Sequence, residues 1–197
     1  LQFSSFFVGH NADSPNDNAT SLKDRSVKGL RVNFPNQPWY GWVSYRVYGT
    51  HYNPAVGFNQ RNGFKRVQPS LKYSPLFDNS KTIREIEWGV RYEYLTSLEN
   101  LLLTENMTFT LADLKFESGD RIGAEVSRNY EFLEETFDIL GDGEIIVSPD
   151  EYINWSYELG ASTASFRKIS GSVDYEAGGF WTGNISNLNL GLVVRPR

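Results

Sequence analysis

The sequence predicts an all-β protein, an antiparallel up-and-down meander of about ten long strands. Three observations lead to this prediction: alternation of apolar and polar residues, the length of the alternating runs, and an aromatic content of 15%. Aromatic and β-branched residues are favoured in strands because they pack well on a pleated surface. The alternation is clearest over residues 83–96, where one face carries Ile86, Trp88, Val90, Tyr92 and Tyr94 and the other carries Glu85, Glu87, Gly89, Arg91 and Glu93. A helix would spread these residues around its circumference, whereas a strand separates them completely.

The same pattern recurs along the whole chain. Alternating runs cover residues 2–8, 27–34, 39–48, 64–74, 83–96, 100–109, 121–130, 153–162, 169–177 and 188–194. Many predicted strands are on the order of 10–14 residues long, against about 5–6 in soluble domains. A tilted strand needs roughly 9–11 residues to cross the hydrocarbon core of a membrane. Aromatic residues such as Trp39, Trp155 and Trp181 lie near strand ends, as in the interfacial girdles of barrels. We therefore expect the meander to be part of a transmembrane β-barrel, with residues 1–197 forming a single region, a fragment of a larger outer-membrane β-barrel domain.

The predicted connections support this expectation. The three longest are Gly9–Asp24, Gly49–Asn62 and Leu133–Asp150, and all are odd-numbered, so they leave the same end of the sheet. Even-numbered connections at 35–38 and 165–168 are short. Long loops on the outside and short turns on the periplasmic side are typical of outer-membrane barrels. This pattern predicts a bacterial outer-membrane location with membrane lipid as a partner. The alternative is a soluble antiparallel sandwich, which gives the same alternation but packs its apolar face against a second sheet.

Composition excludes several classes of site. The chain has no cysteine and two histidines, which excludes disulfides, thiolate metal sites and a cysteine nucleophile. A formal net charge of -5 argues against a nucleic-acid partner, which would require clustered positive charge. No apolar run reaches the roughly 18 residues of a transmembrane helix. We predict no cofactor, no metal site and no nucleic-acid partner, and the sequence leaves the oligomeric state open.

Several segments carry a family resemblance. They are 51–58 (HYNPAVGF), 61–64 (RNGF), 69–71 (PSL), 73–75 (YSP), 161–165 (ASTAS), 170–173 (SGSV), 178–183 (GGFWTG) and the tail from Leu188 to Pro196. Together they resemble a family of uncharacterised bacterial outer-membrane proteins in which a family-nine-like carbohydrate-binding domain precedes a long β-barrel domain of unknown function. The resemblance covers most of the chain from about Leu30 onward. It implies an outer-membrane barrel and suggests glycans as a ligand class, but it brings no catalytic residues.

The charged strand faces supply the candidate site residues. We expect the following side chains to line a polar lumen: Glu85, Glu87, Arg91, Glu93, Arg121, Glu125, Asp174 and Glu176. Such a lumen would pass or hold polar solutes such as glycans by charge and size, without a covalent step. Gly178-Gly179 predicts a hairpin turn or bulge. The following Phe180 and Trp181 could stack on a sugar ring or anchor the protein at the membrane interface.

An enzymatic interpretation of the charged residues competes with lumen lining. Glu85 and Glu87 lie two residues apart on one strand, so their Cα atoms are roughly 6–7 Å apart. This overlaps the carboxylate spacing of inverting glycosidases, about 6.5–9.5 Å, and allows a surface-exposed carbohydrate-active hydrolase. Any charged strand face produces such pairs, so lumen lining is favoured and no catalytic residue is predicted.

The acidic loop around Gly141 and Gly143 could bind calcium through hard oxygen ligands. Its acidic residues are Asp138, Asp142, Glu144, Asp150 and Glu151. The spacing does not match an EF-hand, so a solvated acidic loop is favoured. A third alternative for the chain as a whole is a soluble carbohydrate-binding β-sandwich.

Overall fold

The structure, a computed structural model, describes residues 1–9, 21–53, 61–139 and 141–195. Every regular element in this part of the chain is a strand. The strands are β1 (Gln2–Gly9), β2 (Ser26–Asn36), β3 (Trp39–Tyr48), β4 (Phe64–Tyr73), β5 (Ile83–Ser97), β6 (Leu102–Phe116), β7 (Arg121–Phe132), β8 (Phe137–Asp138), β9 (Ile146–Val147), β10 (Glu151–Ser162), β11 (Ile169–Phe180) and β12 (Gly183–Val194). No helix of the described chain is long and apolar enough to cross a membrane.

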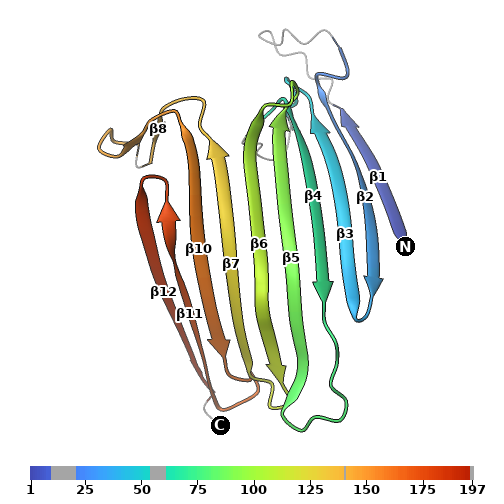
Figure 1. The fold of residues 1–197 in the computed structure, drawn as a ribbon, viewed down its shortest axis with the longest axis vertical. Helices are drawn as coiled ribbons and strands as arrows, with labels where there is room; N and C mark the ends of the chain where they lie inside the picture. Colours follow the sequence, from blue (N-terminus) through green and yellow to red (C-terminus); the bar gives the residue numbers. More distant parts are fainter. Residues whose placement is uncertain (10–20, 54–60, 140, 196–197) are drawn as a thin grey trace.

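Ten of the strands form one antiparallel sheet in the order β1-β2-β3-β4-β5-β6-β7-β10-β11-β12. Each strand pairs with its neighbours in the chain, apart from the small β8-β9 hairpin inserted between β7 and β10 (Figure 1). The predicted up-and-down meander of about ten long strands is confirmed. The connection from Leu133 to Asp150 is partly regular, because it contains this hairpin. The connections predicted at Gly9–Asp24 and Gly49–Asn62 lie partly outside the described residues, as does the segment 51–58.

The strand register separates the side chains into two faces. In a row across four strands, Val90 lies opposite Phe109, Phe109 opposite Val126, and Val126 opposite Tyr157. The adjacent row joins Thr110, Glu125, Glu158 and Glu176. Residues directly opposite in an antiparallel pair point to the same side of the sheet. We call the side of Phe109 and Tyr157 the apolar face and the side of Glu125 and Glu158 the polar face.

Burial is the reverse of that in a soluble domain. Ser44 and Ser70 on the polar face are buried beneath their neighbours, and Asp113 is only 4% exposed. On the apolar face, by contrast, Leu190 and Leu192 are 74% and 73% exposed. Within the described residues the β8-β9 hairpin is the only other sheet, so no second layer of the kind a sandwich requires covers the apolar face.

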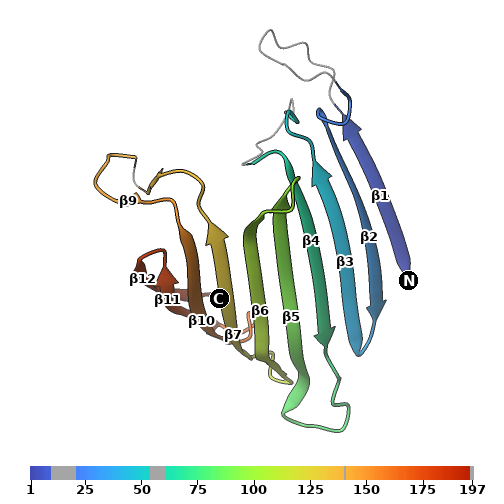
Figure 2. The same ribbon diagram turned by 45° about the horizontal axis from the view of Figure 1, so that its top comes forward.

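The sheet is curved but open. β1 and β12 each pair on one side only within the described chain. Figure 2 shows the sheet curling, so that β11 and β12 are strongly foreshortened while β1 to β6 are seen along their length. The structure therefore shows a long curved antiparallel sheet with two free edges in the described chain, and this sheet is not closed into a barrel.

One irregularity changes which residues share a face. The β6-β7 register shifts between Thr110 and Ala112. Simple alternation would place Asp113 with Met107 and Phe109 on the apolar face. Because a bulge adds one residue to a strand, it reverses the parity after it. Asp113 consequently joins the polar face, opposite Gly123 and Glu87.

Candidate functional site: the polar face

Ion pairs link neighbouring strands across the polar face. Glu87 accepts from Lys72 Nζ at 2.7 Å and Glu85 from Lys115 Nζ at 3.2 Å, and Ser74 also donates to Glu85. Nearer the C-terminal end of β5, Glu93 accepts from Arg66, Gln68 and Asn106 at 3.2–3.4 Å. These groups alternate in sign from strand to strand, so most of the charge on β4, β5 and β6 is compensated.

Glu85 and Glu87 are the pair considered above as glycosidase carboxylates. Each is held by its own lysine, on opposite neighbouring strands: Lys115 belongs to β6 and Lys72 to β4. A general acid needs a carboxyl group that can remain protonated near neutral pH, and a nearby cation favours the ionised form instead. Both carboxylates of the pair are therefore engaged by lysines of neighbouring strands.

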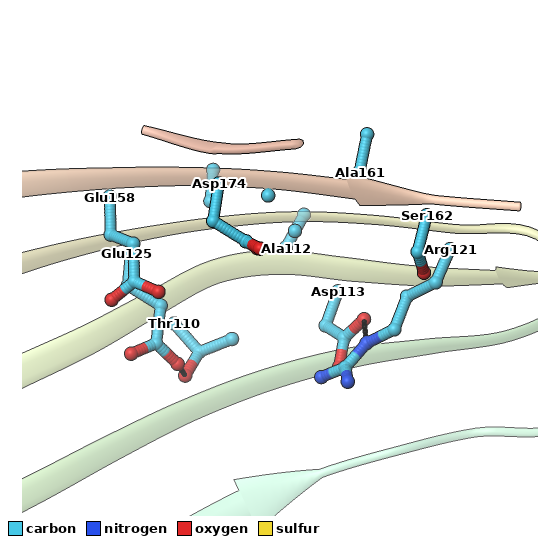
Figure 3. A pocket seen from close by; sticks show the side chains of 12 residues that line it. Thr110, Ala112, Asp113, Arg121, Glu125, Glu158, Ala161, Ser162 and Asp174 are labelled. Atoms are coloured by element: carbon cyan, nitrogen blue, oxygen red, sulfur yellow. Dashed lines mark hydrogen bonds and ion pairs between the residues drawn. The ribbon is translucent and has the colours of Figure 1, made fainter. Parts of the chain in front are cut away.

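A hollow of about 230 Å³ lies on the polar face over β6, β7, β10 and β11 (Figure 3). The polar side chains around it are Thr110, Asp113, Arg121, Glu125, Glu158, Ser162 and Asp174. Gly123 and Gly160 form part of its floor. Their missing side chains leave room between Asp113 and Asp174, which belong to the same cross-strand row.

Arg121 is the cation of this hollow. Its guanidinium binds Asp113 through two nitrogens, with Nε donating to Oδ1 at 2.6 Å (Figure 3). Asp113 is almost fully buried, whereas the Arg121 side chain is 60% exposed. The buried carboxylate is thus neutralised by an arginine that remains accessible to solutes.

An acidic row runs along the hollow. Glu125 lies opposite Glu158, and Glu158 lies opposite Glu176. Arg91 and Thr110 donate to Glu125 at 2.8 and 2.7 Å, and Asn187 donates to Glu176 at 3.3 Å. No ion pair within the described part of the chain reaches Glu158 or Asp174. The hollow therefore has a surplus of negative charge, which attracts cations and repels anions.

The register brings all eight predicted lumen residues to the polar face. Three of them, Arg121, Glu125 and Asp174, surround the hollow. The others are Glu85, Glu87, Arg91 and Glu93 on β5 and Glu176 on β11. Sequence reasoning omitted Glu158 from this set, although its alternation with Tyr157 and Leu159 was a sufficient signal. It also omitted Asp113, for which the signal is the reversed phase of the alternation at Leu114, Lys115 and Phe116 after the bulge.

The hairpin turn or bulge predicted at Gly178-Gly179 is wrong, since β11 pairs with β12 through both glycines without a register shift. Both glycines lie within β11, opposite Ile185 and Asn184, and the hairpin loop is Trp181-Thr182. A Cβ at Gly178 would lie 2.3 Å from the Trp155 carbonyl oxygen, so glycine permits close approach of two backbones here. Trp181 has a φ of 54° at the first loop position, where glycine is usual.

The acidic loop is organised by its own backbone. Asp138 accepts hydrogen bonds from the amides of Gly141 and Gly143 at 2.9 and 2.6 Å. Among the residues that the structure describes, no three acidic or histidine side chains gather closely enough to hold a metal ion.

No family model, curated protein or solved structure matches the chain.

Proposed function

We propose that this chain forms part of a bacterial outer-membrane β-barrel whose polar face lines a lumen for polar solutes. The observation that carries the proposal is the reversed distribution of burial: a polar face linked by ion pairs, and an apolar face left uncovered within the described chain. In water an uncovered apolar face of ten strands would be a strong aggregation surface. In a bilayer the same face contacts hydrocarbon, and the polar face lines the interior.

Aromatic rings on the apolar face support an interfacial position for one end of the sheet, the end where β3 begins and β4 terminates (at the bottom in Figure 1). Trp39, Tyr73 and Trp88 are neighbours across β3, β4 and β5. Their ring centroids are 4.6 Å apart for Trp39 and Tyr73 and 6.0 Å for Tyr73 and Trp88. Clusters of amphipathic rings at the level of the lipid headgroups are typical of outer-membrane barrels.

Several charged side chains interrupt the apolar face, among them Lys28 and Lys65 in the row of Val47, and a linked group of Glu105 and Arg128. Arg128 donates to Glu105 at 3.0 Å, and the Tyr92 hydroxyl donates to the same carboxylate at 2.9 Å. The group lies near the upper ends of β6 and β7, since Glu105 is close to Leu102 and Arg128 is close to Phe132. Paired charges close to a strand end can extend toward the headgroups, so this position is compatible with a lipid-facing surface.

The charge of the hollow indicates which solutes such a lumen favours. Its surplus carboxylates favour cationic and neutral solutes over anions, by field and size without a covalent step. Glycans enter this proposal through the family resemblance.

A pair of arginine substitutions on β12 tests the proposal. Leu190 is on the apolar face and its neighbour Asn189, opposite Asp174, is on the polar face. In the protein refolded into lipid vesicles, Leu190→Arg is expected to destabilise the inserted state by about 2–4 kcal/mol, the cost of arginine facing hydrocarbon. Asn189→Arg should insert normally. Equal tolerance of both variants would contradict the proposal, as would a stable monomer of the unmodified protein in detergent-free buffer.

A further inference from the structure

A second hollow occupies the opposite end of the polar face from Arg121. Its volume is about 280 Å³, and it is lined by Thr104, Asn106, Asn129, Tyr130, Glu131, Tyr152, Asn154, Gly179, Phe180 and Trp181. These residues come from the upper ends of β6, β7 and β10, from the last two residues of β11 and from the β11-β12 turn (Figure 1). Glu131 is the only charged residue among them, so this hollow differs in chemistry from the acidic one.

Three amide side chains form a row across it. Asn106 lies directly opposite Asn129, and Asn129 directly opposite Asn154. Asn106 donates to Glu93 at 3.4 Å. The structure assigns the Asn129 amide no hydrogen bond with any described residue. Each amide has two donor hydrogens and an acceptor oxygen, so the row offers both functions at the spacing of adjacent strands.

Aromatic rings border the same hollow. Trp181 packs edge-on against Tyr152, with ring centroids 5.2 Å apart, and lies 6.0 Å from Phe137. Tyr152 is in turn fixed by a hydrogen bond of 2.8 Å from its hydroxyl to the Ser148 carbonyl. The indole is therefore held in place by rings from β8 and β10.

The backbone of Trp181 is held by the amide row itself. In the amide orientation that satisfies both groups, Asn154 accepts from the Trp181 N–H at 3.2 Å and donates to the Trp181 carbonyl at 3.3 Å. Gly179 permits this contact, because a Cβ there would lie 2.4 Å from the side-chain amide of Asn154. A bulky residue with positive φ requires such support, and conformations of this kind cluster at binding sites.

We propose that this second hollow binds a neutral saccharide ring. A pyranose has an apolar C–H face that packs on an aromatic ring and a rim of hydroxyl groups that both donate and accept hydrogen bonds. Trp181 supplies the aromatic surface, Asn106 and Asn129 supply the hydrogen bonds, and Asn154 is a positioning residue for Trp181. The inference rests on the proposed function only in requiring that solutes reach the polar face.

Calorimetric titration of the protein in detergent with four neutral oligosaccharides tests this assignment. The probes are maltohexaose, cellohexaose, xylohexaose and chitohexaose, with hexagalacturonate as an anionic comparison. At least one neutral probe is expected to bind, and Trp181→Ala and Asn129→Ala should each weaken it about tenfold. Trp181→Phe should retain part of the affinity. Asn189→Ala, the same change on the polar face outside this hollow, should leave the affinity unchanged.

Asn154→Ala distinguishes positioning from direct contact. It should weaken binding and also change the near-ultraviolet circular dichroism of the unliganded protein, because Trp181 loses its backbone contacts; Asn129→Ala should leave that spectrum unchanged. The saccharide assignment is overturned if all four neutral probes fail to bind, if only hexagalacturonate binds, or if binding is unaffected by Trp181→Ala and Asn129→Ala. None of these binding measurements depends on insertion into lipid. Failure of the Leu190→Arg test would therefore leave the saccharide assignment standing, and failure of saccharide binding would leave the membrane proposal standing.

Discussion

Glu158 on β10 lies directly opposite Glu125 on β7, with both carboxylates on the polar face. Glu176 faces Glu158 from the other side, so Glu158 has a like charge on each neighbouring strand. Directly opposed like charges destabilise a sheet. The row is therefore a local cost to stability, and it leaves the middle of the polar face electronegative.

We predict that Glu158→Gln stabilises the protein, by about 0.5 kcal/mol at low salt, because it removes repulsion from both sides. The gain should shrink at high salt, since partly exposed charges are screened. Urea unfolding followed by tryptophan fluorescence measures it, with Glu99→Gln in the exposed turn after β5 as the control. A destabilised Glu158→Gln would show that the carboxylate has a favourable partner.

Arg121→Ala should lower the free energy of unfolding by about 2 kcal/mol, because it leaves the buried Asp113 carboxylate without its cation. Adding Asp113→Ala to Arg121→Ala should recover part of that loss. The double-mutant cycle gives the coupling directly. Strictly additive losses would mean that the two residues do not interact.

Gly178→Ala should destabilise the sheet by more than about 1 kcal/mol, although alanine normally suits a strand better than glycine. The added Cβ would lie 2.3 Å from the Trp155 carbonyl oxygen. Gly123→Ala is the matched control, because its nearest contact would be an ordinary 3.9 Å, and it should be neutral or stabilising. Thermal unfolding of the two variants separates the outcomes, and equal melting temperatures would refute the close approach of β10 and β11.

Asp120 connects the β6-β7 turn to the β10-β11 turn. Its carboxylate accepts from Ser118 Oγ, the Ala164 amide and Arg167 at 2.8–2.9 Å. The Ser118 hydrogen bond, followed by the Ala164 amide and Arg167, lowers the pKa of Asp120 below its usual 3.8. A lowered pKa in the folded state gives stability that is present above pH 3.8 and lost as the pH falls below it.

Asp120→Asn should therefore be less stable than the unmodified protein at pH 6, and the difference should disappear as the pH falls through and below 3.8. Unfolding measured across this pH range in detergent tests the prediction. A difference that stays constant with pH would show that the charge of Asp120 contributes nothing.

Period-two alternation is enough to predict the number of main strands, their antiparallel order and the face of every predicted lumen residue. It succeeds because a strand side chain can point to only two sides. It misses Asp113, because the alternating run predicted from the sequence stops at Phe109, whereas the strand continues past a bulge that reverses the phase and places Leu114 and Phe116 on the apolar face. It also misplaces the last turn, because Gly178 allows a close backbone contact and Gly179 a close contact with the Asn154 side chain, and only the three-dimensional structure reveals these contacts.

The second hollow was beyond sequence reasoning for a related reason. Asn106, Asn129 and Asn154 are far apart in the chain, and the register alone makes them neighbours. Phe180 and Trp181 were identified as stacking candidates, but their partners on β8 and β10 were not. Which residues meet in a cross-strand row depends on the register of strand pairing. A register shift of one residue would move every side chain of the shifted strand to the other face.

Nitroxide scanning along β10 tests the membrane orientation most directly. The chain contains no cysteine, so single cysteines at residues 153–162 can be labelled without a background. In lipid vesicles, labels at Tyr157 and Leu159 should be accessible to oxygen dissolved in the hydrocarbon, and labels at Ser156 and Glu158 to a water-soluble nickel complex. Labels at Tyr157 and Leu159 that neither reagent reaches would place the apolar face in a dry protein interior and contradict the account.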